Sequence, residues 1–462
     1  MSKATRREWI GLGVIALPCL LYSMDLTVLN LALPQIGAQL EPSAVQLLWI
    51  VDIYGFLVAG ALVTMGTLGD RIGRRRLLMI GAAVFGVASV LAAFAASAEM
   101  LIATRALLGV AGATLAPSTF SLIRNMFHDP RERTLAISVW IASYSAGAAI
   151  GPLLGGVLLE HFWWGSVFLL AVPVMVLLLV LAPVLLPEYR DPKAGRIDLP
   201  SAALSLAAVL SLIFALKQAA QHGFSAFSIL GICIGITLAV VFVRRQHQLA
   251  DPLIDLRLFR APAFSASLAV YMLGTFVAFG IFVFMTQYLL LVLEMGPLEA
   301  GVWTVPFALG FIAGSMVAPR LVRRLRPADV MLGGLAIAAL GYILITQVGR
   351  SSGPGLLVAG MVLQSIGLAP VFTLTNDLIM GSAPPERAGA ASGISETSSE
   401  LGGALGIALL GSLATAVYGA ALDRTTVTQA LELTAAISAV IVLGMAAVIV
   451  FLLRPKVSPT RA

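Results

Sequence analysis

The sequence predicts an all-α protein that crosses a lipid bilayer many times. Of its 462 residues, 59% are hydrophobic and only 11% are charged, whereas about a quarter of a soluble globular chain is charged. The hydrophobic residues fall into runs of about 20 residues, the length that crosses about 30 Å of hydrocarbon as a helix. No stretch between these runs is long and polar enough to form a soluble domain.

Fourteen apolar segments can be marked off along the chain. They lie near residues 9–33, 44–68, 77–96, 101–123, 134–158, 166–186, 198–217, 226–243, 264–292, 299–318, 330–348, 354–380, 391–418 and 429–453. An even number of spans places both termini on the same side of the membrane.

The positively charged residues indicate which side that is. Of the 29 Lys and Arg residues, 25 lie in segments on the side of the N-terminus, three lie on the opposite side, and Arg105 lies inside a span. Because Lys and Arg accumulate on the cytoplasmic side of membrane proteins, we expect both termini in the cytoplasm and the protein in the plasma (inner) membrane. This placement accounts for the net charge of +6, so we expect no nucleic-acid partner.

Two stretches of the first half of the chain recur in the second half. The basic turn at 71–75 has a counterpart at 320–324, and residues 130–133 have a counterpart at 384–387, each eight predicted spans later. The simplest explanation is two six-helix bundles with two inserted transmembrane helices between them. The predicted domains are an N-terminal six-helix bundle at 1–187, a linker with the two extra helices at 188–262, and a C-terminal six-helix bundle at 263–462.

Three charged residues lie in the outer half of predicted spans. An Asp near the centre of a span costs about 2.5–3.5 kcal/mol on insertion scales, and Asp25 and Asp52 each lie about 10–14 Å below the outer surface at the rise of an α-helix. Arg105 must face the protein interior and find an acceptor, unless its side chain reaches the membrane surface. We expect Asp25 and Asp52 to handle protons or cations, with Arg105 tuning them.

Two further carboxylates, Glu396 and Glu400, lie four residues apart in the thirteenth predicted span and therefore on one helical face. Two carboxylates this close in a low dielectric repel each other, so at least one is expected to be protonated at neutral pH. Such a pair can exchange a proton for a cationic substrate. The alternative is that both merely form hydrogen bonds to Ser or Thr of a neighbouring helix.

A glycine-rich basic turn joins the second and third predicted spans. Its frame is formed by Gly69, Asp70, Arg71, Gly73 and Arg74. The glycines permit a tight reversal, the aspartate can pair with a neighbouring helix, and the arginines stay in the headgroup layer. A cytoplasmic turn of any kind would be basic, but this does not explain the Gly-Asp-Arg-x-Gly frame, so we expect the turn to act as a gate.

A glycine–proline string lies in the fifth predicted span. It contains Gly147, Gly151, Pro152, Gly155 and Gly156. Glycines at four-residue spacing let two helices approach closely, and a proline bends the helix that holds it. We expect this string to form a close helix–helix contact.

Four aromatic residues in the first half of the chain are candidate contacts for a lipophilic cation. They are Trp49, Tyr54, Trp140 and Tyr144. Aromatic rings attract cations through their negative faces, although most aromatic residues of membrane proteins face lipid or lie at the interface.

These motifs and their topology together resemble the major facilitator superfamily. Three stretches are more specifically similar to its fourteen-span drug:proton antiporter branch, which exports quaternary ammonium antiseptics and dyes: residues 24–28, 48–54 and 388–393. The resemblance covers nearly the whole chain and implies the major facilitator fold with two inserted helices. It also implies that Asp25 and Asp52 occupy acidic positions for coupling and cation recognition, and that Glu396 occupies an acidic position of the thirteenth span.

We therefore expect a proton-driven multidrug exporter of lipophilic cations such as quaternary ammonium antiseptics and dyes. The alternative is a proton-linked transporter of an anionic or neutral metabolite, although an anion carrier would usually need more buried arginines than Arg105. An enzyme is not expected, because neither a Gly-Lys-Ser/Thr nor a His-Glu-x-x-His string occurs. We expect no metal and no cofactor besides the proton gradient. The expected partners of a monomeric protein are the lipid bilayer, protons and small lipophilic cations.

Overall fold

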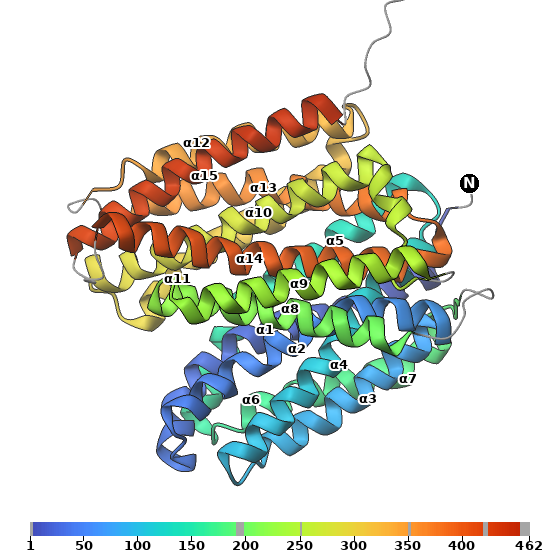
Figure 1. Ribbon diagram of the computed structural model, residues 1–462, viewed down its shortest axis with the longest axis horizontal. Coiled ribbons are helices and arrows are strands. Elements are labelled where there is room, and N and C mark those ends of the chain that lie inside the picture. Colours follow the sequence, from blue (N-terminus) through green and yellow to red (C-terminus); the bar gives the residue numbers. More distant parts are fainter. Residues whose placement is uncertain (1–2, 191–197, 250–251, 350–352, 419–423, 453–462) are drawn as a thin grey trace, which may run out of the picture. The chain divides into compact units, whose positions relative to one another are not determined.

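The computed structural model describes residues 3–190, 198–249, 252–349, 353–418 and 424–452. In these residues every regular element is a helix and no strand occurs (Figure 1). The chain divides into two compact units, Met1–Asp255 with Ala383–Leu401, and Leu256–Ser382 with Gly402–Ala462. The predicted all-α architecture is confirmed, while the domain boundaries at 188 and 263 stay a prediction.

Within the described residues of Met1–Asp255, the first unit contains nine helices. They are α1 (Arg6–Leu40), α2 (Ala44–Ile72), α3 (Arg74–Ala93), α4 (Ala98–Met126), α5 (Pro130–His161), α6 (Ser166–Leu169), α7 (Ala171–Leu185), α8 (Leu199–His222) and α9 (Ala226–Gln248). Within this unit α1 packs on α5, α2 packs on α4 and α8, and α3 packs on α4 and α7. The first half of α14 (Ala388–Tyr418) completes it, preceded by a short 3₁₀ turn, η3 (Pro385–Arg387).

The second unit contains the remaining helices and the second half of α14. They are η1 (Leu256–Arg260), α10 (Pro262–Gln287), η2 (Tyr288–Val292), α11 (Pro297–Leu321), α12 (Pro327–Ile345), α13 (Pro354–Ser382) and α15 (Arg424–Leu452). Here α13 packs on α10, α11 and α12, and α15 packs on α10 and α12.

Each predicted span coincides with a long helix or, for the sixth, with α6 and α7 in succession. Within the described residues, 13 of these helical stretches are long and apolar enough to cross a membrane. The remaining one is α14, whose first half carries Glu396 and Glu400 among serines and threonines and whose last turns are only partly described at the level of side chains. The chain is thus a multi-pass membrane protein.

Polar residues at the helix starts explain where several helices begin. The side chains of Ser43 and Ser97 accept hydrogen bonds from backbone amides of the first turns of α2 and α4, which satisfies donors that have no partner inside the helix. Asp129 does the same for α5, where its carboxylate accepts from the amides of Arg131 at 2.8 Å and Glu132 at 3.2 Å. These two hydrogen bonds lower the pKa of Asp129.

The two inserted helices, α8 and α9, pack on each other and are joined by a polar contact. Asp198 caps α8 by accepting from the amide of Ser201 at 3.1 Å, and its two carboxylate oxygens accept from Arg245 of α9 at 2.7 and 2.9 Å. The hydrogen bonds from Arg245, and then those from Ser201, hold the pKa of Asp198 well below its usual range. The insert is therefore fastened at the end where α8 begins.

Candidate functional site

Arg105 of α4 is buried and paired with one of the two predicted aspartates. Its guanidinium donates to Asp25 Oδ2 of α1 at 2.6 Å and to the backbone carbonyl of Ile50 at 3.2 Å. The guanidinium carbon also lies 4.7 Å from the ring centroid of Tyr54. Separating a buried ion pair would leave an uncompensated charge in the protein interior, so this pair forms an electrically neutral point inside the first unit.

Asp52 of α2, the second predicted aspartate, does not join this pair. Its carboxylate accepts a hydrogen bond from the ammonium group of Lys217 on α8, and the ammonium nitrogen lies 4.8 Å from the ring centroid of Phe56. Lys217 is one of the three basic residues that the sequence places on the side opposite the N-terminus, because the predicted apolar segment ends at 217. The structure extends α8 to His222 and directs the side chain back to α2.

The glutamates of α14 lie beside a group of tyrosines from the first unit. Tyr22 of α1 donates from its hydroxyl to Glu400 Oε1 at 3.1 Å, and its ring centroid lies 6.2 Å from that of Tyr54 and 6.0 Å from that of Tyr144. Glu396 lies one helical turn before Glu400. We call these five residues the tyrosine–glutamate cluster.

The cluster contains polar atoms that the described chain leaves without a hydrogen bond. They are Oε1 of Glu396 and the hydroxyl of Tyr54, both of which are buried. Within the described residues, neither Glu396 nor Glu400 forms an ion pair. Since buried polar groups are normally satisfied, these atoms mark a place where the cluster can accept a proton or a ligand.

The structure separates Asp25 from Asp52, the two aspartates that the sequence places together in the outer half of the predicted spans. Tyr22 precedes Asp25 by three residues, so the two lie about one turn apart on α1. Tyr54 links the cluster to the Asp25–Arg105 pair, because its ring lies beside both the Arg105 guanidinium and the ring of Tyr22, while Asp52 accepts from Lys217 of the inserted helix α8. Sequence reasoning missed Tyr22, although its spacing from Asp25 was a signal that both could lie on one face.

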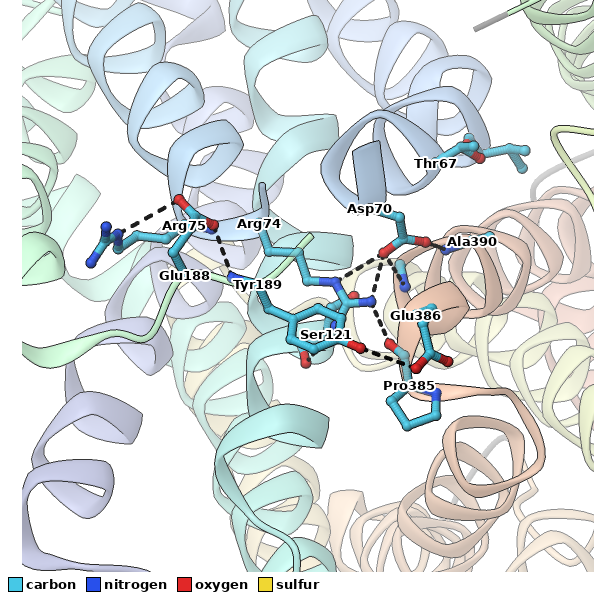
Figure 2. Close-up of polar contacts among 12 residues, drawn as sticks. Thr67, Asp70, Arg74, Arg75, Ser121, Glu188, Tyr189, Pro385, Glu386 and Ala390 are labelled. Carbon is cyan, nitrogen blue, oxygen red and sulfur yellow. Dashed lines mark hydrogen bonds and ion pairs between the residues drawn. The ribbon is translucent and has the colours of Figure 1, made fainter. Parts of the chain in front are cut away.

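The basic turn between α2 and α3 forms a network around Asp70 (Figure 2). The Oδ1 atom of Asp70 accepts from Arg74 Nε at 2.9 Å and Nη2 at 2.7 Å and from the amide of Gly389 at 3.0 Å, while Oδ2 accepts from the amide of Ala390 at 2.9 Å. Arg74, whose side chain is fully buried, also donates to the carbonyl of Pro385 at 2.7 Å. We call these five residues the Asp70 network; it joins α2 and α3 to the start of α14.

Glycines allow α2 and α14 to approach at this point. A Cβ atom at Gly389 would collide with the carbonyl oxygen of Gly66, and one at Gly66 would collide with that of Gly389. The backbone carbonyl of Gly69 accepts a hydrogen bond from the amide of Gly73 at 3.1 Å. Gly73 has φ +111°, a conformation that favours glycine. Arg71 is half-buried nearby.

The linker after α7 supports the same turn. Glu188 accepts from the amides of Arg75 at 3.2 Å and Arg76 at 3.1 Å, and so caps the start of α3. Its carboxylate also pairs with the guanidinium of Arg75 (Figure 2). The ring of Tyr189 lies under Arg74, with 5.0 Å from the guanidinium carbon to the ring centroid. Neither residue was predicted, because a residue in a linker carries no sequence signal for the distant helix end that it contacts.

The glycine–proline string of α5 faces α1 at two of its positions. A Cβ atom at Gly147 would collide with the backbone of Leu20, and one at Gly155 would lie 2.8 Å from Val28. Gly151 is buried, whereas Gly156 has open space around its Cα. The side chain of the predicted Pro152 lies outside the described residues.

The predicted aromatic contacts lie in three different places. Tyr54 and Tyr144 belong to the tyrosine–glutamate cluster, and Trp49 lies near Asp52 with 38% of its surface exposed. Trp140 is a core residue instead: its indole donates to Thr119 at 3.0 Å and packs against Phe120. In the described part of the chain, no group of three or more His, Cys, Asp or Glu residues could hold a metal ion.

The sequence is similar to those of known proteins over nearly its whole length. The sequence profile of the Major Facilitator Superfamily matches residues 15–289 and 264–462. The multidrug efflux pump LfrA of Mycolicibacterium smegmatis is 44% identical over 91% of this chain and 84% of its own length. The methyl viologen resistance protein SmvA of Salmonella typhimurium is 36% identical over 94% of this chain and 88% of its own length.

A solved structure supports the fold. The human organic anion transporter MFSD10 has a TM-score of 0.66 at 18% identity, covering 94% of this chain and 99% of that one. At this identity the likeness concerns the fold alone, and it agrees with the all-helical architecture. The profile match and the identity to the two bacterial relatives show that the chain belongs to the Major Facilitator Superfamily and is a membrane transporter rather than an enzyme.

Proposed function

We propose that the protein is a drug exporter that uses proton entry to expel lipophilic cations. The observation that carries this proposal is the pair Glu396 and Glu400, two membrane carboxylates on one helical face that form no ion pair within the described chain. Burying an uncompensated carboxylate is costly, so such a pair requires a proton or a cation from outside. Because both compete for the same negative charge, occupancy by one excludes the other.

The two membrane aspartates of the first unit are already balanced, which directs attention to the glutamates. Asp25 is bonded to Arg105, and Asp52 is bonded to Lys217. The ammonium group of Lys217 interacts electrostatically with Glu400 but donates its hydrogen bond to Asp52. The tyrosine–glutamate cluster therefore keeps an excess of negative charge that favours cationic cargo.

The surroundings of the two glutamates suit a lipophilic cation. Tyr22, Tyr54 and Tyr144 present three aromatic rings next to the acidic groups, and aromatic faces attract organic cations once these are stripped of water. The hydroxyl of Tyr22 stabilises the ionised form of Glu400, the form that binds a cation.

The Asp70 network is proposed as the gate on the cytoplasmic side. It fastens the start of α14, the helix that carries both glutamates, to α2 and α3. Opening to the cytoplasm would break these hydrogen bonds, and closing would restore them, as the alternating access of this superfamily requires.

The names of the relatives agree with drug export. LfrA is a multidrug efflux pump, SmvA is a methyl viologen resistance protein, and a tetracenomycin C resistance and export protein of Streptomyces glaucescens is 32% identical over 88% of this chain. Methyl viologen is an aromatic organic cation, the kind of cargo proposed here. We propose a monomer in the plasma membrane, with both termini cytoplasmic, that needs no cofactor besides the proton gradient.

An anionic or neutral cargo has less support. The buried guanidinium of Arg105, which an anion would need, already donates to Asp25. Transport that does not depend on the charge of the cargo would favour this alternative.

The test is transport in vesicles that contain the purified protein. We expect an imposed pH gradient to drive tetraphenylphosphonium efflux by the wild type, and the double variant Glu396→Gln, Glu400→Gln to reduce gradient-driven efflux to the level of empty vesicles. Glu432→Gln is the matched control, because Glu432 is a half-buried acid of α15 outside the cluster.

The outcome that refutes the proposal is equally definite. If the double variant keeps gradient-driven efflux while Glu432→Gln behaves like the wild type, the glutamates do not couple protons to cargo. If the wild type shows no response to the gradient, proton-driven export itself is refuted.

A further inference from the structure

Aromatic residues surround the Lys217–Asp52 ion pair. The rings of Trp49 and Phe214 are stacked, with their centroids 6.5 Å apart and their planes inclined by 10°. The ring of Phe56 meets both edge-on, at 6.1 Å from Trp49 and 6.2 Å from Phe214. The ammonium group of Lys217 thus lies between a carboxylate and an aromatic wall.

Two helices supply this site, and the sequence spacing explains how. Trp49, Asp52 and Phe56 are three and four residues apart on α2, and Phe214 and Lys217 are three apart on α8, so each set lies on one helical face. The site therefore exists only where inserted helix α8 packs on α2. A chain with two six-helix bundles and no insert would lack Phe214 and Lys217.

An ammonium group beside a carboxylate and over an aromatic face is the arrangement by which proteins bind organic ammonium ions. Here the chain's own lysine supplies the ammonium. We propose that Trp49, Asp52, Phe56 and Phe214 form a binding site for organic cations, and that Lys217 occupies this site as an internal ligand that an external cation displaces.

The exposure of the pair supports displacement. The Lys217 side chain is 40% exposed and that of Asp52 is 20% exposed, so a cation from outside the protein can reach the pair. The buried Asp25–Arg105 pair differs, because the arginine side chain is only 2% exposed. Lysine also has a flexible four-carbon stem, so it can leave Asp52 without movement of the backbone.

That the cation is lipophilic rests on the proposed function, whereas binding at this site can be measured without transport. The probe is tetraphenylphosphonium, titrated into detergent-purified protein at pH 7 and followed by calorimetry. Lys217→Met removes the internal competitor and is expected to tighten tetraphenylphosphonium binding about tenfold. A tenfold change matches the combined free energy of one partly exposed ion pair and one cation–π contact, which the cation no longer has to displace. Lys217→Arg keeps a tethered cation and should not tighten binding.

The double variant Lys217→Met, Asp52→Asn identifies the site. Because it removes the carboxylate, it should lose the tenfold gain. The matched control is Arg424→Met, which removes the cation of an exposed ion pair with Glu294 far along the chain and should leave the affinity unchanged. Unchanged or weaker binding in Lys217→Met, or a gain that persists in the double variant, would overturn the proposal.

A second measurement uses the unmodified protein, so it does not depend on whether a variant folds. The sequence contains four lysines, Lys3, Lys193, Lys217 and Lys456, and acetylation of each can be followed by mass spectrometry. If tetraphenylphosphonium displaces Lys217 from Asp52, acetylation of Lys217 accelerates relative to that of Lys3. A rate that stays the same or falls at saturating cation contradicts displacement, whether or not the protein exports drugs.

Discussion

Replacing Asp70 with asparagine tests the proposed gate most directly. The Asp70 carboxylate acts only as an acceptor in these contacts: it accepts two hydrogen bonds from Arg74, one from Gly389 and one from Ala390. Asparagine has the same size but only one acceptor oxygen, and its NH₂ group would face these donors. The substitution therefore removes the acceptor that holds α14 without removing volume.

The magnitude follows from the burial of Arg74. Its side chain is 0% exposed and that of Asp70 is 6% exposed, so Asp70→Asn leaves a buried guanidinium without its counter-charge. Removing one partner of a buried ion pair costs about 3–5 kcal/mol. About 1.4 kcal/mol corresponds to a tenfold change in an equilibrium constant. The equilibrium constant between the closed gate and an open gate in which water reaches Arg74 should therefore shift toward the open gate by a factor of about 10² to 10³.

The assay is a distance distribution between spin labels on the two sides of the network. Labels at Arg76→Cys and Pro384→Cys, both at exposed positions, report the separation of α3 and the start of α14. The chain has two native cysteines, Cys19 and Cys233, which are replaced by alanine. We expect one short, narrow distance in the wild-type background and a dominant longer distance in Asp70→Asn.

Arg75→Met is the matched control. Arg75 adjoins Arg74, but its guanidinium donates to the carbonyls of Pro183 and Leu186 and not to α14. Its distance distribution should match that of the parent. The reasoning is refuted if Asp70→Asn leaves the short distance unchanged, or if Arg75→Met lengthens it equally.

Three further predictions concern other parts of the first unit. Tyr22→Phe removes the hydroxyl that donates to Glu400; since a hydrogen bond to a charged group contributes about 1.5–3 kcal/mol, calorimetry at pH 7 should show cation binding weakened about tenfold or more. Gly147→Ala should lower the free energy of unfolding by about 1–3 kcal/mol, because its methyl group would collide with the backbone of α1, whereas Gly156→Ala should have no effect in the same melting experiment. For Asp198, the lowered pKa means that its ionised form stabilises the fold above its usual pKa and that this contribution is lost only as pH falls through the lowered value. The melting temperatures of wild type and Asp198→Asn should therefore differ by a constant amount from about pH 8 to about pH 5 and converge only in stronger acid.

The positions of the helices could be predicted because lipid imposes a simple rule on the sequence. The predicted segments at 44–68 and 101–123 lie within α2 and α4, which run a few residues further at their ends. Hydropathy marks the part of a helix in hydrocarbon, while the helix itself continues toward the headgroups. At Lys217 the apolar run likewise ends while α8 goes on to His222, and the side of the membrane on which Lys217 lies stays a prediction.

The pairing of charged side chains could not be predicted, because it depends on how each helix is rotated about its axis. From depth alone, Arg105 could have met Asp25 or Asp52, and the rotation of α4 directs it to Asp25. Lys217 then balances Asp52 from a helix that the sequence connects to α2 only through a long stretch of chain. The Asp70–Arg74 contact was easier to anticipate, since the two residues are four apart on a turn that already looked constrained.

The arrangement of α14 indicates how cargo binding and gating could be linked. Its first turn supplies Gly389 and Ala390 to Asp70, and the same helix carries Glu396 and Glu400. At 1.5 Å per residue, the two groups lie about 10–16 Å apart along one uninterrupted helix, too far for direct contact. A rigid helix, however, moves as a unit. Any shift of α14 that follows the exchange of a proton for a cation at the glutamates must therefore also strain the two hydrogen bonds that Gly389 and Ala390 donate to Asp70. Because such coupling is reciprocal, weakening those bonds by Asp70→Asn should change the affinity of the glutamates for a cation as well as the gate.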